Sequence, residues 1–263
     1  MCIFATLVAN SGPFVAEQPD SQGNSVPCIF KGAPLVALAP NLASMVDNLG
    51  AGPLLKGVAS KSYWEAAHPA EDVGPFNDPD IEKILSLKPT LVLMIKEGTP
   101  KKLYDRLKKR NIAVFAFSIN TMDDLKKGYL QLGCLLQEPK KAQELISTFE
   151  ADLRAAVQKL KNKYPESMLL LSFKPMVAIN AGTFTHDLFK ELDIPLMSLP
   201  YKKKYPEVDR EWFGSHKPKH IFRFCMGEIS DKPKTFKGIP VKNLTNNVWI
   251  QPSFKVIDAL KDL

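Results

Sequence analysis

Residues 80–94 read Asp-Ile-Glu-Lys-Ile-Leu-Ser-Leu-Lys-Pro-Thr-Leu-Val-Leu-Met, and residues 209–223 read Asp-Arg-Glu-Trp-Phe-Gly-Ser-His-Lys-Pro-Lys-His-Ile-Phe-Arg. The second stretch begins 129 positions after the first, and both have an acidic start, a glutamate at the third position and a Lys-Pro pair. Proline cannot donate the hydrogen bond that continues a helix, and it disfavours helix in the residue before it. Each stretch therefore predicts a short amphipathic helix, a Lys-Pro stop and a strand.

A single distant repeat of this kind indicates two similar lobes that face each other. Apolar runs of strand length alternate with helical patterns on either side of the repeats, which favours an α/β fold with mostly parallel sheets flanked by helices. The longest helical pattern runs from Pro139 to about Lys163, and we expect this rigid helix to join the lobes. A cleft between two such lobes usually holds a ligand.

We divide the chain into an N-terminal segment with a linker (1–33), a first α/β lobe (34–137), the connecting helix (138–164) and a second α/β lobe (165–263). Asn41 is expected to cap the helix after the first strand. The pattern predicts strands at 35–39, 54–58, 90–95, 112–117, 168–173 and within 241–249, and helices at 42–49, 80–87, 100–110, 121–135, 139–163, 187–192 and 253–262.

The composition is that of an ordinary globular protein, with 263 residues, 45% hydrophobic and 24% charged. The formal net charge is +7, but the lysines are scattered in short clusters on predicted helix ends and loops. No Arg- and aromatic-rich strand and no Cys/His finger spacing is present, so we expect solvated charge and no nucleic-acid partner.

The cysteines and the N-terminus bear on the compartment. Cys2, Cys28, Cys134 and Cys225 include no C-x-x-C pair, and the sequence leaves open whether they form a disulfide or stay as thiols. No stretch is long enough to span a bilayer. The apolar start, Met1 to Ala9, is either the remnant of a signal peptide or a poorly ordered terminus, and we favour the first because the rest of the chain indicates export.

From Leu35 to Leu263 the chain resembles the class III substrate-binding proteins of ATP-binding-cassette (ABC) importers, of the vitamin B12 and ferric-siderophore type in the helical-backbone metal receptor superfamily. The resemblance implies an extracytoplasmic, monomeric receptor with no intrinsic cofactor, which holds an iron or cobalt chelate between its lobes and docks on a permease dimer. Four segments carry it: Leu38-Ala-Pro-Asn-Leu with Leu49-Gly-Ala-Gly, Val73-Gly-Pro-Phe76, Leu87-Lys-Pro-Thr-Leu-Val-Leu93, and Trp249-Ile-Gln-Pro-Ser-Phe-Lys-Val-Ile257.

Aromatic residues outside the periodic core faces are the first candidates for ligand contact, because each buries much apolar area at little entropic cost. The resemblance places Tyr63, Phe76 and Trp249 at the cleft, and Trp64 is a further candidate. Phe184 and His186 precede a predicted helix of the second lobe, where His186 could contact the metal of a chelate. Asn41 is the last of the uncharged candidates for ligand contact.

Charged residues supply the remaining candidates. Lys96, Lys174 and Arg223 follow three strands, where they would favour an anionic ligand, although each could equally be a surface cation. Glu82 and Glu211 occupy the same place in the two repeats. A carboxylate in the first turn favours the positive end of its helix whatever its function, but in the resembled family a glutamate on each lobe meets arginines of the permease.

Two other classes of function remain as alternatives. A receptor for bare zinc or manganese needs several His and carboxylate ligands from four loops. The loop after the first strand contains no histidine, which argues against this class. The four histidines of the chain lie elsewhere, at His68, His186, His216 and His220. An enzyme with a cleft between two lobes is also conceivable, but no G-x-S-x-G, P-loop or G-x-G-x-x-G motif is present.

Overall fold

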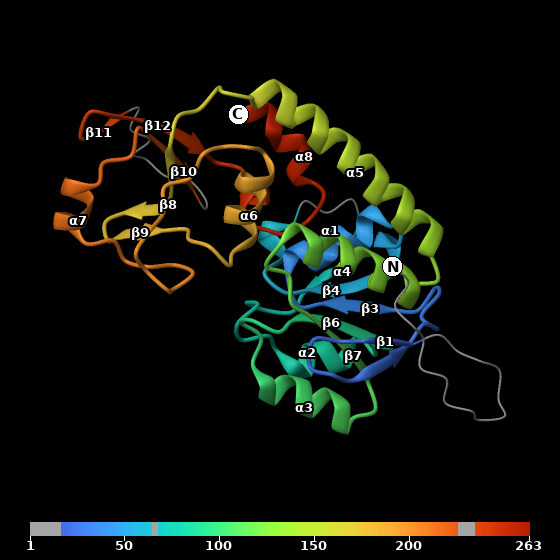
Figure 1. The fold of residues 1–263 in the computed structure, drawn as a ribbon. Helices are drawn as coiled ribbons and strands as arrows, with labels where there is room; N and C mark the ends of the chain where they lie inside the picture. The colour runs from blue at the N-terminus through green and yellow to red at the C-terminus, as the bar shows by residue number, and fades with distance from the viewer. Residues whose placement is uncertain (1–16, 65–67, 226–234) are drawn as a thin grey trace.

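The computed structural model describes residues 17–64, 68–225 and 235–263, which form two α/β lobes with a long helix, α5 (Pro139–Leu160), between them in the chain (Figure 1). Each lobe contains a five-stranded sheet. The predicted fold class, two lobes with mostly parallel sheets flanked by helices, is confirmed.

The sheet of the N-terminal lobe is parallel throughout and has the strand order β5-β4-β3-β6-β7. An α-helix connects most of its successive strands, as is usual for parallel pairing, whereas the described part of the connection from β4 to β5 has only a 3-10 turn, Lys61–Tyr63. Its strands are β3 (Leu35–Ala37), β4 (Leu55–Val58), β5 (Glu71–Asp72), β6 (Leu91–Ile95) and β7 (Ala113–Phe117), and its helices are α1 (Pro40–Asn48), α2 (Ile81–Ser86), α3 (Lys101–Lys109) and α4 (Met122–Leu135).

The sheet of the C-terminal lobe has the order β11-β12-β10-β8-β9. Its central strands β8 (Ser167–Phe173), β10 (His220–Phe224) and β12 (Ile239–Leu244) are parallel. The edge strand β9 (Met176–Ala178) pairs antiparallel with β8, and the edge strand β11 (Thr235–Phe236) pairs antiparallel with β12. Neither edge strand was predicted, because both are too short to show the alternation of apolar and polar residues that marks a strand. The helices are α6 (Phe184–Glu191), α7 (Arg210–Ser215) and α8 (Val256–Ala259).

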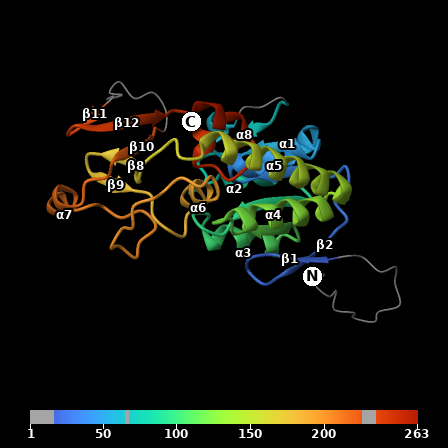
Figure 2. The same ribbon diagram turned by 45° about the horizontal axis from the view of Figure 1, so that its top comes forward.

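Helix α5 has 22 residues and would extend about 33 Å. It packs beside α4, and Figure 2 shows the two helices running along the same side of the molecule. It ends at Leu160 rather than at Lys163, because Lys161 leaves helical geometry and Asn162 takes a left-handed conformation. In the described part of the chain, no helix is both long and apolar enough to cross a membrane.

The repeat is confirmed down to its hydrogen bonds. The Asp80 carboxylate caps α2 by accepting from the backbone N–H groups of Glu82 and Lys83, at 2.9 and 3.1 Å. The Asp209 carboxylate caps α7 in the same way, accepting from Glu211 and Trp212 at 2.7 and 3.0 Å. Both helices have six residues, and a strand follows each of them, β6 and β10.

The predicted linker at 17–33 contains ordered structure. Strands β1 (Glu17–Pro19) and β2 (Ser25–Pro27) form a hairpin whose turn is held by Asp20, which accepts from the N–H groups of Gln22 and Asn24. A disulfide between Cys28 and Cys134 ties the following segment to α4. Small polar residues had suggested a linker, but the same residues also favour tight turns.

Three further predicted helix boundaries were wrong. Helix α1 begins at Pro40, since proline is well suited to the first helical position, so Asn41 lies inside the helix and does not cap it. Helix α6 begins at Phe184 instead of 187, because Thr183 accepts from the N–H of His186 and caps it there. The closing helix is only α8 followed by a short 3-10 turn, Leu260–Asp262.

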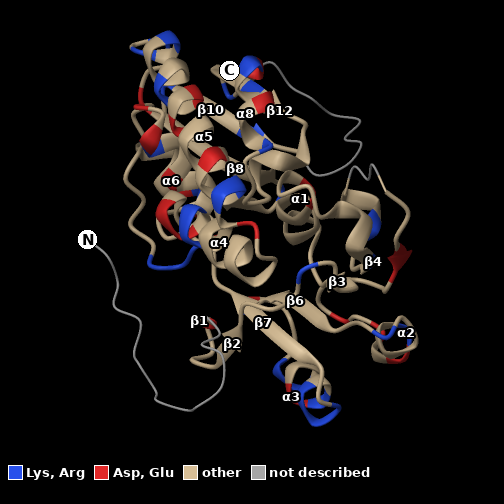
Figure 3. Cartoon of the chain, turned by 90° about the vertical axis from the view of Figure 1, so that its right-hand side faces the viewer, with Lys and Arg blue, Asp and Glu red and all other residues tan. Residues whose placement is uncertain are grey.

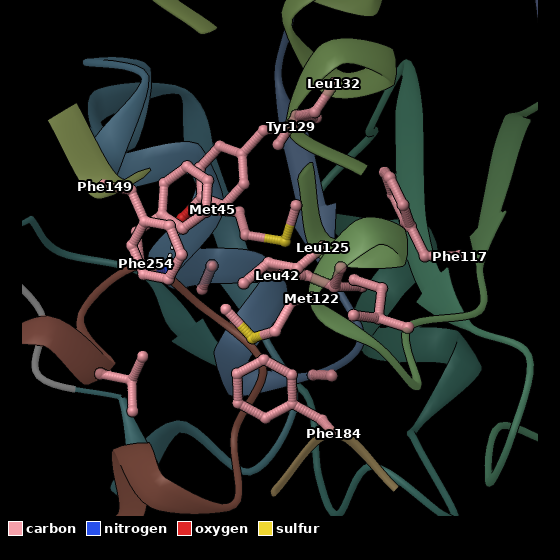
Figure 4. Packing of buried hydrophobic residues seen from close by; sticks show 14 of the residues in the cluster. Leu42, Met45, Phe117, Met122, Leu125, Tyr129, Leu132, Phe149, Phe184 and Phe254 are labelled. Carbon is pink, nitrogen blue, oxygen red and sulfur yellow. Dashed lines mark hydrogen bonds between the residues drawn. The ribbon is translucent and has the colours of Figure 1, made fainter. Parts of the chain in front are cut away.

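The C-terminal segment returns from the second lobe to the first. The Phe254 ring lies between Tyr129 of α4, at a centroid distance of 3.8 Å, and Phe149 of α5, at 4.2 Å (Figure 4). The Tyr129 hydroxyl accepts from the backbone N–H of Phe254 and donates to Asn48 Oδ1. Burial raises the pKa of Tyr129 far above its usual range, so this phenol stays neutral. One apolar cluster therefore extends through both lobes.

Phe254→Ala should reduce the free energy of unfolding by about 3–5 kcal/mol, because it removes the ring between two aromatic partners. Chemical denaturation followed by circular dichroism measures this. Leu130→Ala, on α4 beside Tyr129 but 45% exposed, is the control and should change stability by less than about 0.5 kcal/mol. Equal effects of the two substitutions would contradict a central place for Phe254.

Candidate ligand-binding site

Parallel pairing places the carboxyl ends of β3 to β7 at one edge of the N-terminal sheet, where ligands of such sheets usually bind. Two large aromatic side chains are exposed on loops that follow these ends. Tyr63, after β4, is 49% exposed, and Phe76, after β5, is 42% exposed. We take this edge as the N-terminal half of the candidate site.

Ser60 joins the two loops that carry these aromatics. Its N–H donates to Gly74 O at 2.7 Å, and its hydroxyl accepts from the N–H of Phe76 at 3.0 Å. Its carbonyl accepts from the N–H of Tyr63 at 3.0 Å. Ser60 has a positive φ of 50°, which turns the chain toward Tyr63. The two exposed rings are therefore carried by a fixed backbone.

Gly98, in the loop after β6, lies against the Phe76 ring. A Cβ at position 98 would come within 2.7 Å of Phe76 Cε2, and the φ of Gly98 is +101°. Both facts require glycine here. A third loop of the same edge thus supports the aromatic platform, by which we mean Tyr63 and Phe76.

The C-terminal lobe meets this edge at the loop between β7 and α4. Lys204 Nζ donates to Asn120 Oδ1 at 2.6 Å, and Asp187 Oδ2 accepts from the N–H of Met122 at 2.7 Å. Tyr205, next to Lys204, is 54% exposed. Tyr205 was not among the candidates predicted from the sequence. Its position between three lysines and a proline was the available signal, since an exposed aromatic in a basic loop suits an anionic, partly apolar ligand.

Two of the predicted aromatics belong to the core instead. Trp249 is fully buried in a 3-10 turn (Asn247–Trp249) and packs against Phe189 and Phe224. Trp64 is buried, and its indole N–H donates to Asp47 Oδ2 at 2.7 Å. The prediction from loop position was wrong about their exposure, because a short turn can direct a large ring inward as readily as a helix can.

The three predicted cations do not converge. Lys96 Nζ donates to Ser21 O in the N-terminal hairpin, at 3.1 Å. The Arg223 side chain is buried, with its guanidinium 4.8 Å from the centre of the Phe173 ring. Lys174 is exposed in the turn between β8 and β9. These three residues therefore do not form a common cationic rim. The sequence indicated that they follow strands, but it could not indicate which groups their side chains contact.

Of the other predicted residues, Asn41 and Phe184 are buried. Asn41 Nδ2 donates to Pro252 O at 3.4 Å and so contacts the returning C-terminal segment. Half-buried His186 lines a cavity of about 550 Å³ within the C-terminal lobe, together with Lys190, Leu196 and Tyr201. Burial lowers the pKa of His186, and the nearby Asp187 carboxylate only partly opposes this.

The glutamates of the two repeats are both exposed. Glu82 Oε1 lies 3.5 Å from Arg106 Nη2, a pair that is too exposed to contribute much stability. No group of three or more His, Cys, Asp or Glu side chains suited to a metal ion occurs within the described ranges.

Residues 35–245 match the family model of the periplasmic binding proteins, and the chain belongs to this family. It is 24% identical over 240 residues to the vitamin B12-binding protein of Vibrio campbellii, a match that covers 87% of each chain. Its fold is similar to that of a haem-binding protein, with a TM-score of 0.75, 17% identity and coverage of 98% and 92%. It is also similar to a siderophore-binding protein solved with acinetobactin and ferric iron, with a TM-score of 0.73, 15% identity and coverage of 95% and 98%.

The lowered pKa of His186 predicts an acid sensitivity of the C-terminal lobe. Below the ordinary value of 6.5 the unfolded chain binds a proton that the folded protein resists, so stability falls as the pH falls through this range. His220 acts in the same direction through burial and Lys242. His186→Gln should therefore remove part of the loss of unfolding free energy between about pH 7.5 and about pH 5.5.

Denaturation at the two pH values measures this effect. Gln143→Asn, which changes an exposed side chain without a titratable group, is the control and should leave the pH dependence as it is in the parent. If His186→Gln lost as much stability on acidification as the parent, the assignment to His186 would be wrong.

Proposed function

We propose that this protein is an extracytoplasmic receptor that captures a metal chelate between its two lobes and delivers it to an ABC importer. The chelate is an iron–siderophore, haem or corrinoid complex. The family and the relatives named above are binding proteins, and the vitamin B12, haem and ferric siderophore named for these relatives are all metal chelates.

The aromatic platform is the observation that supports this function most directly. Tyr63 and Phe76 expose large ring surfaces to solvent on a hydrogen-bonded backbone, at the edge of the sheet where the other lobe approaches. Exposed rings of this kind cost little to order, because their loops are already fixed, and they would pack against an apolar macrocycle or a catecholate. Tyr205 would contribute a ring from the opposite lobe.

Docking on the importer is the second part of the proposal. Glu82 and Glu211 occupy equivalent positions on the two lobes, each in the first turn of a short helix that an aspartate caps. A pair of equivalent carboxylates suits a permease built of two equivalent subunits. Capture of the chelate needs no chemistry by the receptor, and ATP hydrolysis in the importer would supply the energy of transport.

Removal of the platform should weaken chelate binding. We expect Tyr63→Ala with Phe76→Ala to lose at least about tenfold in affinity, since each ring contributes about 1 kcal/mol or more of contact. Trp64 lies next to Tyr63, so its fluorescence should report titration with cyanocobalamin, hemin, ferric hydroxamate and ferric catecholate, corrected for absorbance.

Leu130→Ala, another exposed apolar side chain but on α4, should bind the same chelate like the parent. Saturable binding of one chelate that the double variant retains in full would remove the platform from the site. A folded parent that binds none of the four would overturn the proposed function.

Glu82→Ala with Glu211→Ala should abolish uptake of the chelate by cells that carry the importer, because the docking carboxylates would be lost. Affinity for the free chelate should stay as in the parent. Glu71→Ala with Glu191→Ala removes one exposed carboxylate from each lobe outside the repeats and serves as the control. Normal uptake of the chelate with the Glu82/Glu211 variant would contradict the docking role of these two glutamates.

A further inference from the structure

Helix α3 presents a densely basic surface at the end of the N-terminal lobe. Between 101 and 110 seven positions are exposed, and all but Asp105 are lysine or arginine. The opposite side of the helix, with Leu103, Tyr104 and Leu107, is buried against the lobe. Figure 3 shows these cations gathered on α3.

The stability of the helix explains the basic residues of its last turn, where the helix dipole favours cations, but not those of its first turn. Lys101 and Lys102 occupy the first turn, which carries no acidic residue, and there the helix dipole disfavours positive charge. Helix α5 also begins with lysines, but Lys141 is paired with Glu144. The basic patch is defined as Lys101, Lys102, Lys109 and Arg110, which form no ion pair within 4 Å with any carboxylate of the described chain.

The position of the patch indicates what it faces. Arg106 of α3 contacts Glu82 of α2 at 3.5 Å, so the patch flanks the carboxylate assigned to permease docking. A permease lies in a bilayer, and surfaces beside a docking contact come close to the lipid head groups. This step rests on the proposed function. Clusters of lysine and arginine near a membrane are attracted by anionic lipids.

We infer that the basic patch of α3 binds the head groups of anionic phospholipids and so orients the receptor on the membrane. Long, flexible side chains suit such a diffuse negative surface, which requires charge but no fixed geometry. The attraction acts over about one Debye length, so added salt should weaken it.

Vesicle flotation tests the inference with the purified full chain and no importer. The parent should float with phosphatidylcholine vesicles that contain phosphatidylglycerol, should not float with phosphatidylcholine alone, and should be released by salt. Substitution of the four patch residues by Gln should reduce the partition coefficient at least about tenfold. The same number of substitutions by Gln at Lys140, Lys141, Lys159 and Lys161, at or beside α5, should have a much smaller effect.

Circular dichroism of each variant checks folding, and Lys101→Arg with Lys102→Arg, which keeps the charge, should float like the parent. Failure of the parent to float at low salt, or equal loss in the two Gln variants, would overturn the inference. Binding to polyglutamate but not to vesicles would also overturn it and indicate an acidic protein partner. None of these results depends on chelate binding, so the proposed function is tested separately.

Discussion

The stacking of Phe254 between Tyr129 and Phe149 is the contact on which the arrangement of the lobes depends. It joins α4 and α5, which are consecutive in the chain, to the returning C-terminal segment, 125 positions after Tyr129. The Tyr129 hydroxyl fixes the stack by two hydrogen bonds, one to the half-buried Asn48 and one from the buried backbone N–H of Phe254. Because an interior polar group must be paired to be tolerated, the stack and its hydrogen bonds constrain each other.

This linkage limits how the lobes can move and thereby shapes the site. The chain passes between the lobes twice, once along α5 and once through the segment that carries Phe254. Two further contacts hold the lobes together at the start of α4. Asp187 accepts from the N–H of Met122, and Lys204 donates to Asn120. A ligand is therefore expected to settle onto a largely formed surface, which keeps the ordering cost of binding low.

The sequence was sufficient for the repeat, the parallel central strands of both sheets and the long helix, since these follow from local signals: an acidic cap, a Lys-Pro stop and hydrophobic periodicity. It also placed Tyr63 and Phe76 on loops, where the structure shows both rings exposed after β4 and β5, and their contact with a ligand stays a prediction. It failed where packing partners decide. Trp249, Lys96 and Arg223 occupy the expected backbone regions, yet Phe189, Ser21 and Phe173 respectively determine where their side chains lie.

The disulfide has a consequence for damaged molecules. Cys28 and Cys134 are 106 positions apart, and in the sequence Cys28 precedes and Cys134 follows the five strands of the N-terminal sheet. This part of the chain is thus a covalent ring. One proteolytic cut in any of its loops opens the ring but releases no fragment, so a nicked receptor keeps all its pieces. The cut would become visible only on a reducing gel.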